Sequence, residues 1–176
     1  MNEKDTRVYA KAIRFAIDAH GNQKRKYTGE PYWHHPVSVA TKLMETGCCD
    51  IDMICAALLH DTVEDTTITL DDIQREFGSS VALMVFWLTE KTEKPIGNRS
   101  LRKEIECKFL SLAPDDVKTI KVCDLIDNTK TIETHDPEFA KVYFKEKKDL
   151  LLNALVGADR ALWGEAMRIV DRYYAY

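Results

Sequence analysis

The residues best suited to chemistry are concentrated in one heptad, His60-Asp61-Thr62-Val63-Glu64-Asp65-Thr66, directly after the apolar run at 54–59. The heptad holds one imidazole and three carboxylates. Such groups are costly to remove from water unless something pairs with them. A solvated, charged helix end is the ordinary alternative. The buried run before the heptad favours a metal-binding or catalytic role, with a divalent cation as the obvious partner.

The four ionisable side chains of the heptad are expected to share one helix face. On the helix that is expected to carry the heptad, a rotation of about 100° per residue places His60 and Glu64 about 40° apart, and Asp61 and Asp65 likewise. This face lies near the C-terminus of the helix, where the dipole disfavours carboxylates. Solvation or a bound cation would have to offset this unfavourable interaction of the carboxylates with the helix dipole.

A second imidazole must come from elsewhere in the chain, which has five histidines. His34 and His35 directly precede Pro36, at an expected helix start where a side chain can be held rigidly. One of these two is the best second imidazole, and a half-exposed or capping residue is the alternative.

A further carboxylate is expected on the helix that contains Asp124. Ile120, Asp124, Asn128 and Thr131 follow a helical spacing and would share one face. A polar network between helices is the alternative interpretation. Two histidines and two aspartates would offer mixed nitrogen and oxygen ligation, which suits Mn²⁺, Fe²⁺ or Zn²⁺ better than a thiolate zinc site.

One group of basic residues could meet an anion. The consecutive Lys24, Arg25 and Lys26 lie just upstream of the histidine pair, and beside a metal they would suit phosphate oxygens, although a solvated loop is the default. The lysines of a later helix are expected on its exposed face: Lys141, Lys145, Lys147 and Lys148.

The elements that position these residues are predicted to be helices only. Apolar periodicity with start and stop signals predicts helices at about 5–20, 36–46, 51–64, 70–77, 80–88, 100–112, 115–131, 137–156 and 159–174. Asp50, Thr69 and Ser80 are the expected N-caps, Gly21, Gly78 and Gly157 the expected ends, and 21–34 and 92–99 the main loops. No repeat or linker is evident, so we predict an all-α chain with a single domain at 1–176.

Composition limits the partners. The net charge of −4 argues against a nucleic-acid polymer. The longest apolar run, 81–88, is too short to span a bilayer, and the polar N-terminus does not look like a signal peptide. Five cysteines without a CxxC pair favour reduced thiols and a cytoplasmic location.

A homo-oligomer stays open, because several aromatic side chains could form either a contact surface or core: Phe86, Trp87, Trp163, Tyr173, Tyr174 and Tyr176.

Three segments together resemble the hydrolase domain of Rel/Spo alarmone enzymes, which are HD-domain phosphohydrolases. They are Gly-Glu-Pro-Tyr-Trp-His-His-Pro at 29–36, Ala-Ala-Leu-Leu-His-Asp-Thr-Val-Glu-Asp-Thr at 56–66, and the spaced set Asp124, Asn128 and Thr131. The resemblance covers roughly 5–160. Because no synthetase domain follows, the chain resembles a stand-alone small alarmone hydrolase with an HD-domain fold.

The resemblance implies a role for each candidate residue. The implied ligands of Mn²⁺, or of another divalent transition metal, are His35, His60, Asp61 and Asp124. Glu64 and Asp65 would position or deprotonate the attacking water. Asn128 and Thr131 would contact the ribose or phosphates of the nucleotide. Arg25, Lys26 and Thr28 would line the guanine side, where Tyr27 is an additional residue. On the later helix, the resemblance also implies Tyr143 as a substrate-binding residue.

The activity implied by this resemblance is removal of the 3′-pyrophosphate from ppGpp or pppGpp, which gives GDP or GTP. The substrate would thus be a small guanosine nucleotide. Two alternatives stay open: an HD phosphohydrolase that acts on another nucleotide such as NADPH, and a non-catalytic domain that binds an alarmone.

Overall fold

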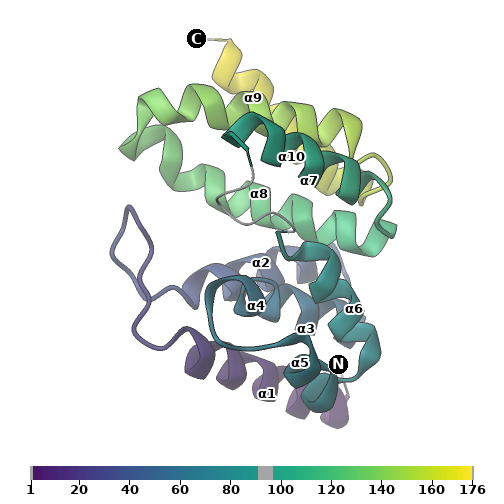
Figure 1. Ribbon diagram of the computed structural model, residues 1–176. Coiled ribbons are helices and arrows are strands. Elements are labelled where there is room, and N and C mark those ends of the chain that lie inside the picture. Colours follow the sequence, from purple (N-terminus) through teal and green to yellow (C-terminus); the bar gives the residue numbers. More distant parts are fainter. Residues whose placement is uncertain (1, 91–96, 176) are drawn as a thin grey trace. The chain divides into compact units, whose positions relative to one another are not determined.

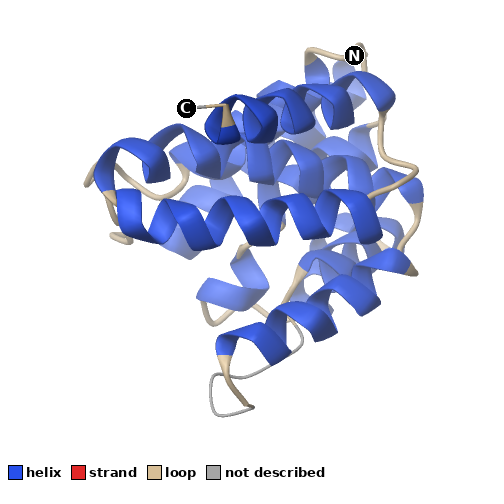
Figure 2. Ribbon diagram, turned by 90° about the horizontal axis from the view of Figure 1, so that it is seen from above, coloured by secondary structure: helices blue, strands red, loops and turns tan. Residues whose placement is uncertain are grey.

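The structure is a computed structural model that describes residues 2–90 and 97–175 (Figure 1). The described residues form helices and loops, and their one strand-like feature is an isolated antiparallel bridge between Lys24 and Pro31. Figure 2 shows the same chain coloured by secondary structure. The predicted all-α class is therefore confirmed.

The chain divides into two compact units, 1–89 and 90–176, and each is described by itself. The single domain at 1–176 stays a prediction. The first unit contains α1 (Glu3–His20), α2 (His34–Met44), α3 (Ile51–Leu59), α4 (Thr62–Asp65), α5 (Leu70–Phe77) and α6 (Ser79–Leu88). Helix α3 is the core of this unit, because it packs against α1, α2 and α6 and its residues from Met53 onward are buried.

Local capping explains where α3 and α5 of the first unit begin. The Asp50 carboxylate accepts hydrogen bonds from the backbone N–H groups of Asp52 and Met53, as expected of an N-cap. Thr69 and Asp72 form a reciprocal capping box at the start of α5. The Ser80 cap was predicted wrongly, because α6 begins at Ser79 directly after Gly78. Gly78 has φ of 91°, a conformation that favours glycine, and this allows α6 to follow α5 without a linker.

The helix predicted at 51–64 is instead two helices. Helix α3 ends at Leu59, and α4 begins at Thr62. Side chains compete for the last carbonyl groups of α3: the Thr62 hydroxyl donates to the Leu59 oxygen at 2.7 Å, and Nδ1 of His60 lies 2.9 Å from the Ala57 oxygen. The assumption that the heptad continues one regular helix was therefore wrong.

The second unit contains α7 (Arg99–Ser111), α8 (Asp115–His135), α9 (Pro137–Asn153) and α10 (Arg160–Tyr174). Helix α8 packs against α9 and α10, and α9 also packs against α7. Helix α8 runs four residues beyond its predicted end at 131, up to the residue before Asp136, whose side chain caps α9. Helix α9 ends at Asn153, before the predicted end at 156 and before Gly157.

The structure bears only in part on the expected location, thiols, second loop and oligomeric state. No helix among the described residues is long and apolar enough to cross a membrane. All five cysteines are free thiols, and the cytoplasmic location stays a prediction. The predicted loop at 92–99 falls mostly outside the described residues, as does Tyr176 of the aromatic set. Tyr173 stacks on Phe144 within the second unit at a ring distance of 3.8 Å, which is a core contact, and the homo-oligomer stays a prediction.

Candidate metal centre

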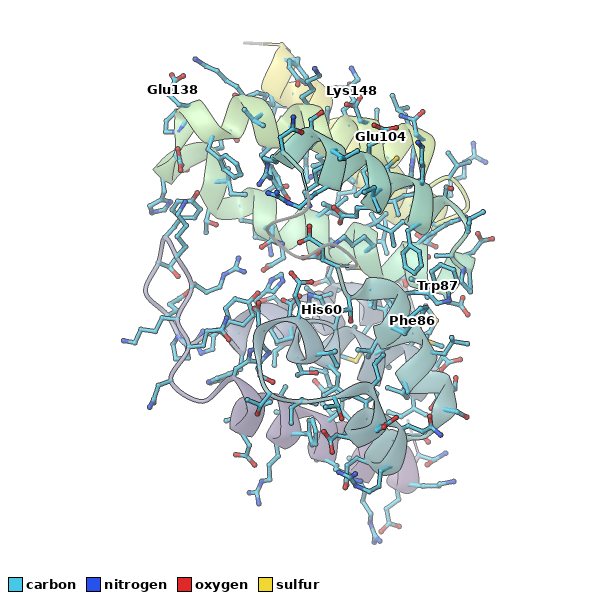
Figure 3. All side chains as sticks on the ribbon, viewed as in Figure 1. His60, Phe86, Trp87, Glu104, Glu138 and Lys148 are labelled. Atoms are coloured by element: carbon cyan, nitrogen blue, oxygen red, sulfur yellow. The ribbon has the colours of Figure 1, made fainter. Side chains whose placement is uncertain are left out.

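Three predicted ligands meet in the first unit. His35, in the first turn of α2, and the His60-Asp61 pair, between α3 and α4, each offer a ligand atom, and these atoms lie within 4.8 Å of one another. Asp61 Oδ2 is 3.1 Å from His60 Nε2 and 3.5 Å from His35 Nε2. His60 is labelled in Figure 3. Of the neighbouring histidines, His35 is the one in this cluster, whereas the ring of His34 packs against Trp33.

Burial and one hydrogen bond fix the state of the His60 imidazole. Both imidazoles are 2% exposed, so they are held away from bulk water. The carbonyl oxygen of Ala57 can only accept a hydrogen bond, so Nδ1 of His60 carries the proton and donates to it at 2.9 Å. In the neutral imidazole this leaves the lone pair on Nε2, next to Asp61. Such a backbone partner is the usual way in which a metal-binding histidine is oriented.

Tyr32 is a site residue that the sequence analysis did not identify. Its hydroxyl donates to Asp61 Oδ2 at 2.7 Å, and its ring packs edge-on against His35 at 5.8 Å. Tyr32 therefore contacts two of the three clustered side chains. Its position in the Pro-Tyr segment just before the histidine pair was the signal available in the sequence.

The two carboxylates predicted to handle water lie one turn after Asp61. Glu64 and Asp65 are both exposed residues of α4. The orientation of Asp65 is set in part by Gln23, whose amide nitrogen donates to Asp65 Oδ2 at 2.9 Å. Because the chain breaks before α4, these two carboxylates follow the His60-Asp61 pair but do not belong to the buried helix α3.

The basic residues belong to a hairpin-like loop between α1 and α2. Arg25 N donates to the Glu30 oxygen, and Gly29 N to the Arg25 oxygen, which closes the loop. The guanidinium of Arg25 lies 5.9 Å from the centre of the Tyr32 ring, and Tyr32 in turn contacts His35 and Asp61. The Lys26 ammonium donates to the Tyr27 hydroxyl at 3.0 Å. The Thr28 hydroxyl donates to Glu30 at 3.2 Å.

The other predicted site residues lie in the second unit. Asp124, Asn128 and Tyr143 line a cleft of about 890 Å³ whose walls come from α7, α8 and α9. Asp124 accepts hydrogen bonds from Asn128 at 2.5 Å and from Lys121 at 2.9 Å. Thr131 follows on α8, one turn after Asn128. That Asp124 completes the cluster of the first unit stays a prediction.

Lys147 was placed wrongly by the sequence analysis. It is 1% exposed, whereas Lys145 on the same helix is exposed as predicted. The Lys147 ammonium donates to the Thr129 hydroxyl at 2.7 Å and lines the same cleft as Asp124. Burial lowers the pKa of Lys147 to about 8. The simple rule that charged residues face solvent failed here because a hydroxyl on α8 offered a partner.

The helical fold and the cluster of His35, His60 and Asp61, which could hold a metal ion, point to a class of helical metal-binding domains, and comparisons with known proteins agree with this class. The HD-domain family profile matches residues 12–151. The chain belongs to the HD-domain family, and the resemblance to Rel/Spo-type hydrolase domains is confirmed.

Three similar proteins illustrate this relationship. The guanosine-3′,5′-bis(diphosphate) 3′-pyrophosphohydrolase of Aquifex aeolicus is 41% identical over 142 residues, which are 80% of this chain and 20% of that protein. The MESH1 enzyme of the same name from Danio rerio is 35% identical over 140 residues, 78% of this chain and 76% of that one. A solved structure described as a metazoan ortholog of SpoT that hydrolyzes ppGpp has a TM-score of 0.85 and 27% identity, and the match covers 95% of each chain. This chain thus spans about a fifth of the Aquifex relative and three quarters of the MESH1 relative.

Proposed function

We propose that this protein is a metal-dependent hydrolase that removes the 3′-pyrophosphate from ppGpp or pppGpp. The observation that carries the proposal is the buried cluster of His35, His60 and Asp61 in a chain of the HD-domain family. The similar proteins named as 3′-pyrophosphohydrolases of guanosine-3′,5′-bis(diphosphate) support the substrate class. The similarity of the described helices to a structure that hydrolyzes ppGpp supports the same class.

The residues of the cluster fit a divalent transition metal. Two imidazole nitrogens and a carboxylate oxygen, all within 4.8 Å of one another, are a donor set that Mn²⁺, Fe²⁺ and Zn²⁺ accept. We propose Mn²⁺, with Asp124 as a further ligand. When bound, the cation would lower the pKa of a water molecule and neutralise charge on the attacked phosphate.

The protein's own side chains would perform the remaining steps. Glu64 and Asp65 are exposed to solvent next to the cluster, so they can accept the proton of the attacking water. Arg25 and Lys26 would offset phosphate charge or line the guanine side together with Thr28. Asn128 and Thr131 would contact the ribose or phosphates, and Tyr143 would be a further substrate-binding residue. Tyr32 would hold Asp61 in a fixed orientation during these steps.

Release of pyrophosphate from ppGpp by the purified protein, with and without Mn²⁺ after chelation, tests the proposal. Asp61→Ala should lose both bound metal and activity. Glu64→Ala should lose activity while its bound Mn²⁺, counted by elemental analysis, stays equal to that of the unaltered protein. No release of pyrophosphate by the metal-loaded protein would refute the proposed reaction, and equal metal loss in both variants would refute the division of roles.

The same assay separates the two alternatives. Turnover of NADPH in preference to ppGpp would indicate an HD phosphohydrolase for another nucleotide. Binding of intact ppGpp without turnover, in protein shown to hold metal, would indicate a binding domain.

A further inference from the structure

A chain of side-chain hydrogen bonds connects the end of α1 with Asp65. Nδ1 of His20, the last residue of α1, lies 2.8 Å from Oε1 of Gln23. Nε2 of the same amide donates to Asp65 Oδ2 at 2.9 Å. Neither His20 nor Gln23 is among the ligands or water-handling groups named above, yet Gln23 contacts one of them directly.

The chemistry of the three groups fixes the direction of each hydrogen bond. An ionised carboxylate can only accept, so the NH₂ side of the Gln23 amide must face Asp65. The amide oxygen therefore faces His20, and Nδ1 of His20 must be the donor. In the neutral imidazole the proton is consequently on Nδ1, and this tautomer is a definite prediction of the arrangement.

His20 would be a poor choice as a purely structural residue. It is 4% exposed, and within the described part of the chain its Nε2 atom is buried and has no hydrogen-bond partner. A buried polar atom without a partner lowers stability. Phenylalanine would fill a similar volume without this loss. The bond that His20 offers and phenylalanine cannot is the Nδ1–H donor to Gln23.

The same residues connect Asp65 to Asp61. Gln23 and Tyr32 face each other at the base of the loop, where the backbone N–H of Tyr32 donates to the backbone carbonyl oxygen of Gln23 at 2.9 Å. The His20 ring packs on the Tyr32 ring at 4.8 Å, and the Tyr32 hydroxyl binds Asp61. The base of the loop thus places one donor on each of the two carboxylates, and His20 contacts both donor residues.

We infer that Gln23 is a positioning residue for Asp65 and that His20 holds the Gln23 amide in the orientation this requires. The inference rests on the proposed function in one respect, namely that Asp65 handles the attacking water. The inferred hydrogen bonds do not depend on that function. They can be tested with a measurement that needs no substrate.

The substrate-independent test is the tautomer of His20, read from long-range ¹H–¹⁵N correlation spectra of the metal-free protein. The spectrum of His20→Phe identifies the His20 signals by their loss. We expect the Nδ1–H pattern in the unaltered protein and a shift toward averaged tautomers in Gln23→Leu, which removes the acceptor. An Nε2–H pattern in the unaltered protein, or an unchanged pattern in Gln23→Leu, would overturn the inference.

The kinetic test compares three variants. Gln23→Leu and His20→Phe should each lower kcat for ppGpp about ten- to a hundred-fold, the usual effect of removing a partner of a site residue, with little change in KM or in Mn²⁺ affinity. His20→Asn should recover most of the kcat, because its amide nitrogen can replace Nδ1 as the donor. Gln74→Leu, at an exposed position of α5, is the matched control.

The outcomes keep the two proposals apart. If the unaltered protein does not hydrolyse ppGpp, the proposed function fails, while the tautomer still decides the positioning arrangement. If ppGpp is hydrolysed and Gln23→Leu retains the full kcat, the positioning role is refuted and the proposed function stands. Failure of His20→Asn to recover more activity than His20→Phe would likewise refute the role of His20 as donor.

Discussion

Replacing Lys147 by methionine should change how the stability of the protein depends on pH. Lys147 is 1% exposed, and desolvation by burial lowers its pKa from 10.5 to about 8, against an opposing effect of the Asp124 and Glu165 charges. The difference between these values corresponds to about 3 kcal/mol of free energy by which the fold disfavours the charged amine. Methionine has a similar length and carries no charge, so the variant lacks this penalty.

The direction in which the unfolding free energy changes with pH follows from how many protons the folded and unfolded states bind. Below about pH 8 the amine is charged in both states, and the penalty is present in full. Between about 8 and 10.5 the unfolded chain binds more protons than the folded one, so the unfolding free energy rises with pH. The unaltered protein should therefore gain about 2–3 kcal/mol relative to Lys147→Met between pH 7 and pH 10.

The assay is urea denaturation followed by far-ultraviolet circular dichroism, with a chelator and a reducing agent present, at four values of pH from 7 to 10. Lys145→Met, an exposed position on the same helix, controls for the loss of one positive charge. The local hydrogen bonds favour a clean comparison, because the Thr129 hydroxyl still donates to the Leu125 oxygen when Lys147 is absent. Parallel stability curves for the unaltered protein and Lys147→Met would refute the reasoning.

Three other predictions concern the first unit. Tyr32→Phe removes the hydroxyl that donates to Asp61, so Mn²⁺ affinity, titrated by electron paramagnetic resonance, should fall about tenfold; equal affinity would contradict the role of Tyr32. Asp50→Ala removes the N-cap of α3 and should lower the unfolding free energy by about 1 kcal/mol in urea, whereas an unchanged midpoint would mean that solvent replaces the cap. Burial raises the pKa of the Cys55 thiol to about 12, so Cys55 should resist a thiol reagent in the folded protein at pH 8 while the exposed Cys49 reacts; rapid labelling of both would contradict this.

The sequence predicted most helices well because their signals are local. The caps at Asp50 and Thr69 and the glycine ends at Gly21 and Gly78 depend on a few neighbouring residues, and all four lie where the residue types indicated. The need of buried imidazole and carboxylate groups for partners left His34 and His35 as alternatives, and only the resemblance to Rel/Spo hydrolase domains selected His35, which lies with His60 and Asp61.

The features that were missed depend on contacts between segments far apart in the sequence. Tyr32 meets Asp61 across 29 positions, and Gln23 meets Asp65 across 42. Lys147 is buried because a threonine on another helix lies within hydrogen-bond distance of its amine. Periodicity assigns a residue to a helix face, but it does not reveal which polar group a neighbouring element will present to it.

The wrong prediction with the greatest bearing on function is the continuous helix at 51–64, because the structure has a break after α3. In a regular helix, adjacent residues point about 100° apart, so periodicity places His60 and Asp61 on one broad face without bringing their side chains into contact. Here α3 ends at Leu59, and Asp61, with φ of −95° and ψ of −8°, lies in the turn between α3 and α4. Asp61 Oδ2 lies 3.1 Å from His60 Nε2. The candidate ligand atoms of the His-Asp pair thus lie where α3 ends, and Thr62 binds the last carbonyl group of α3 and starts α4.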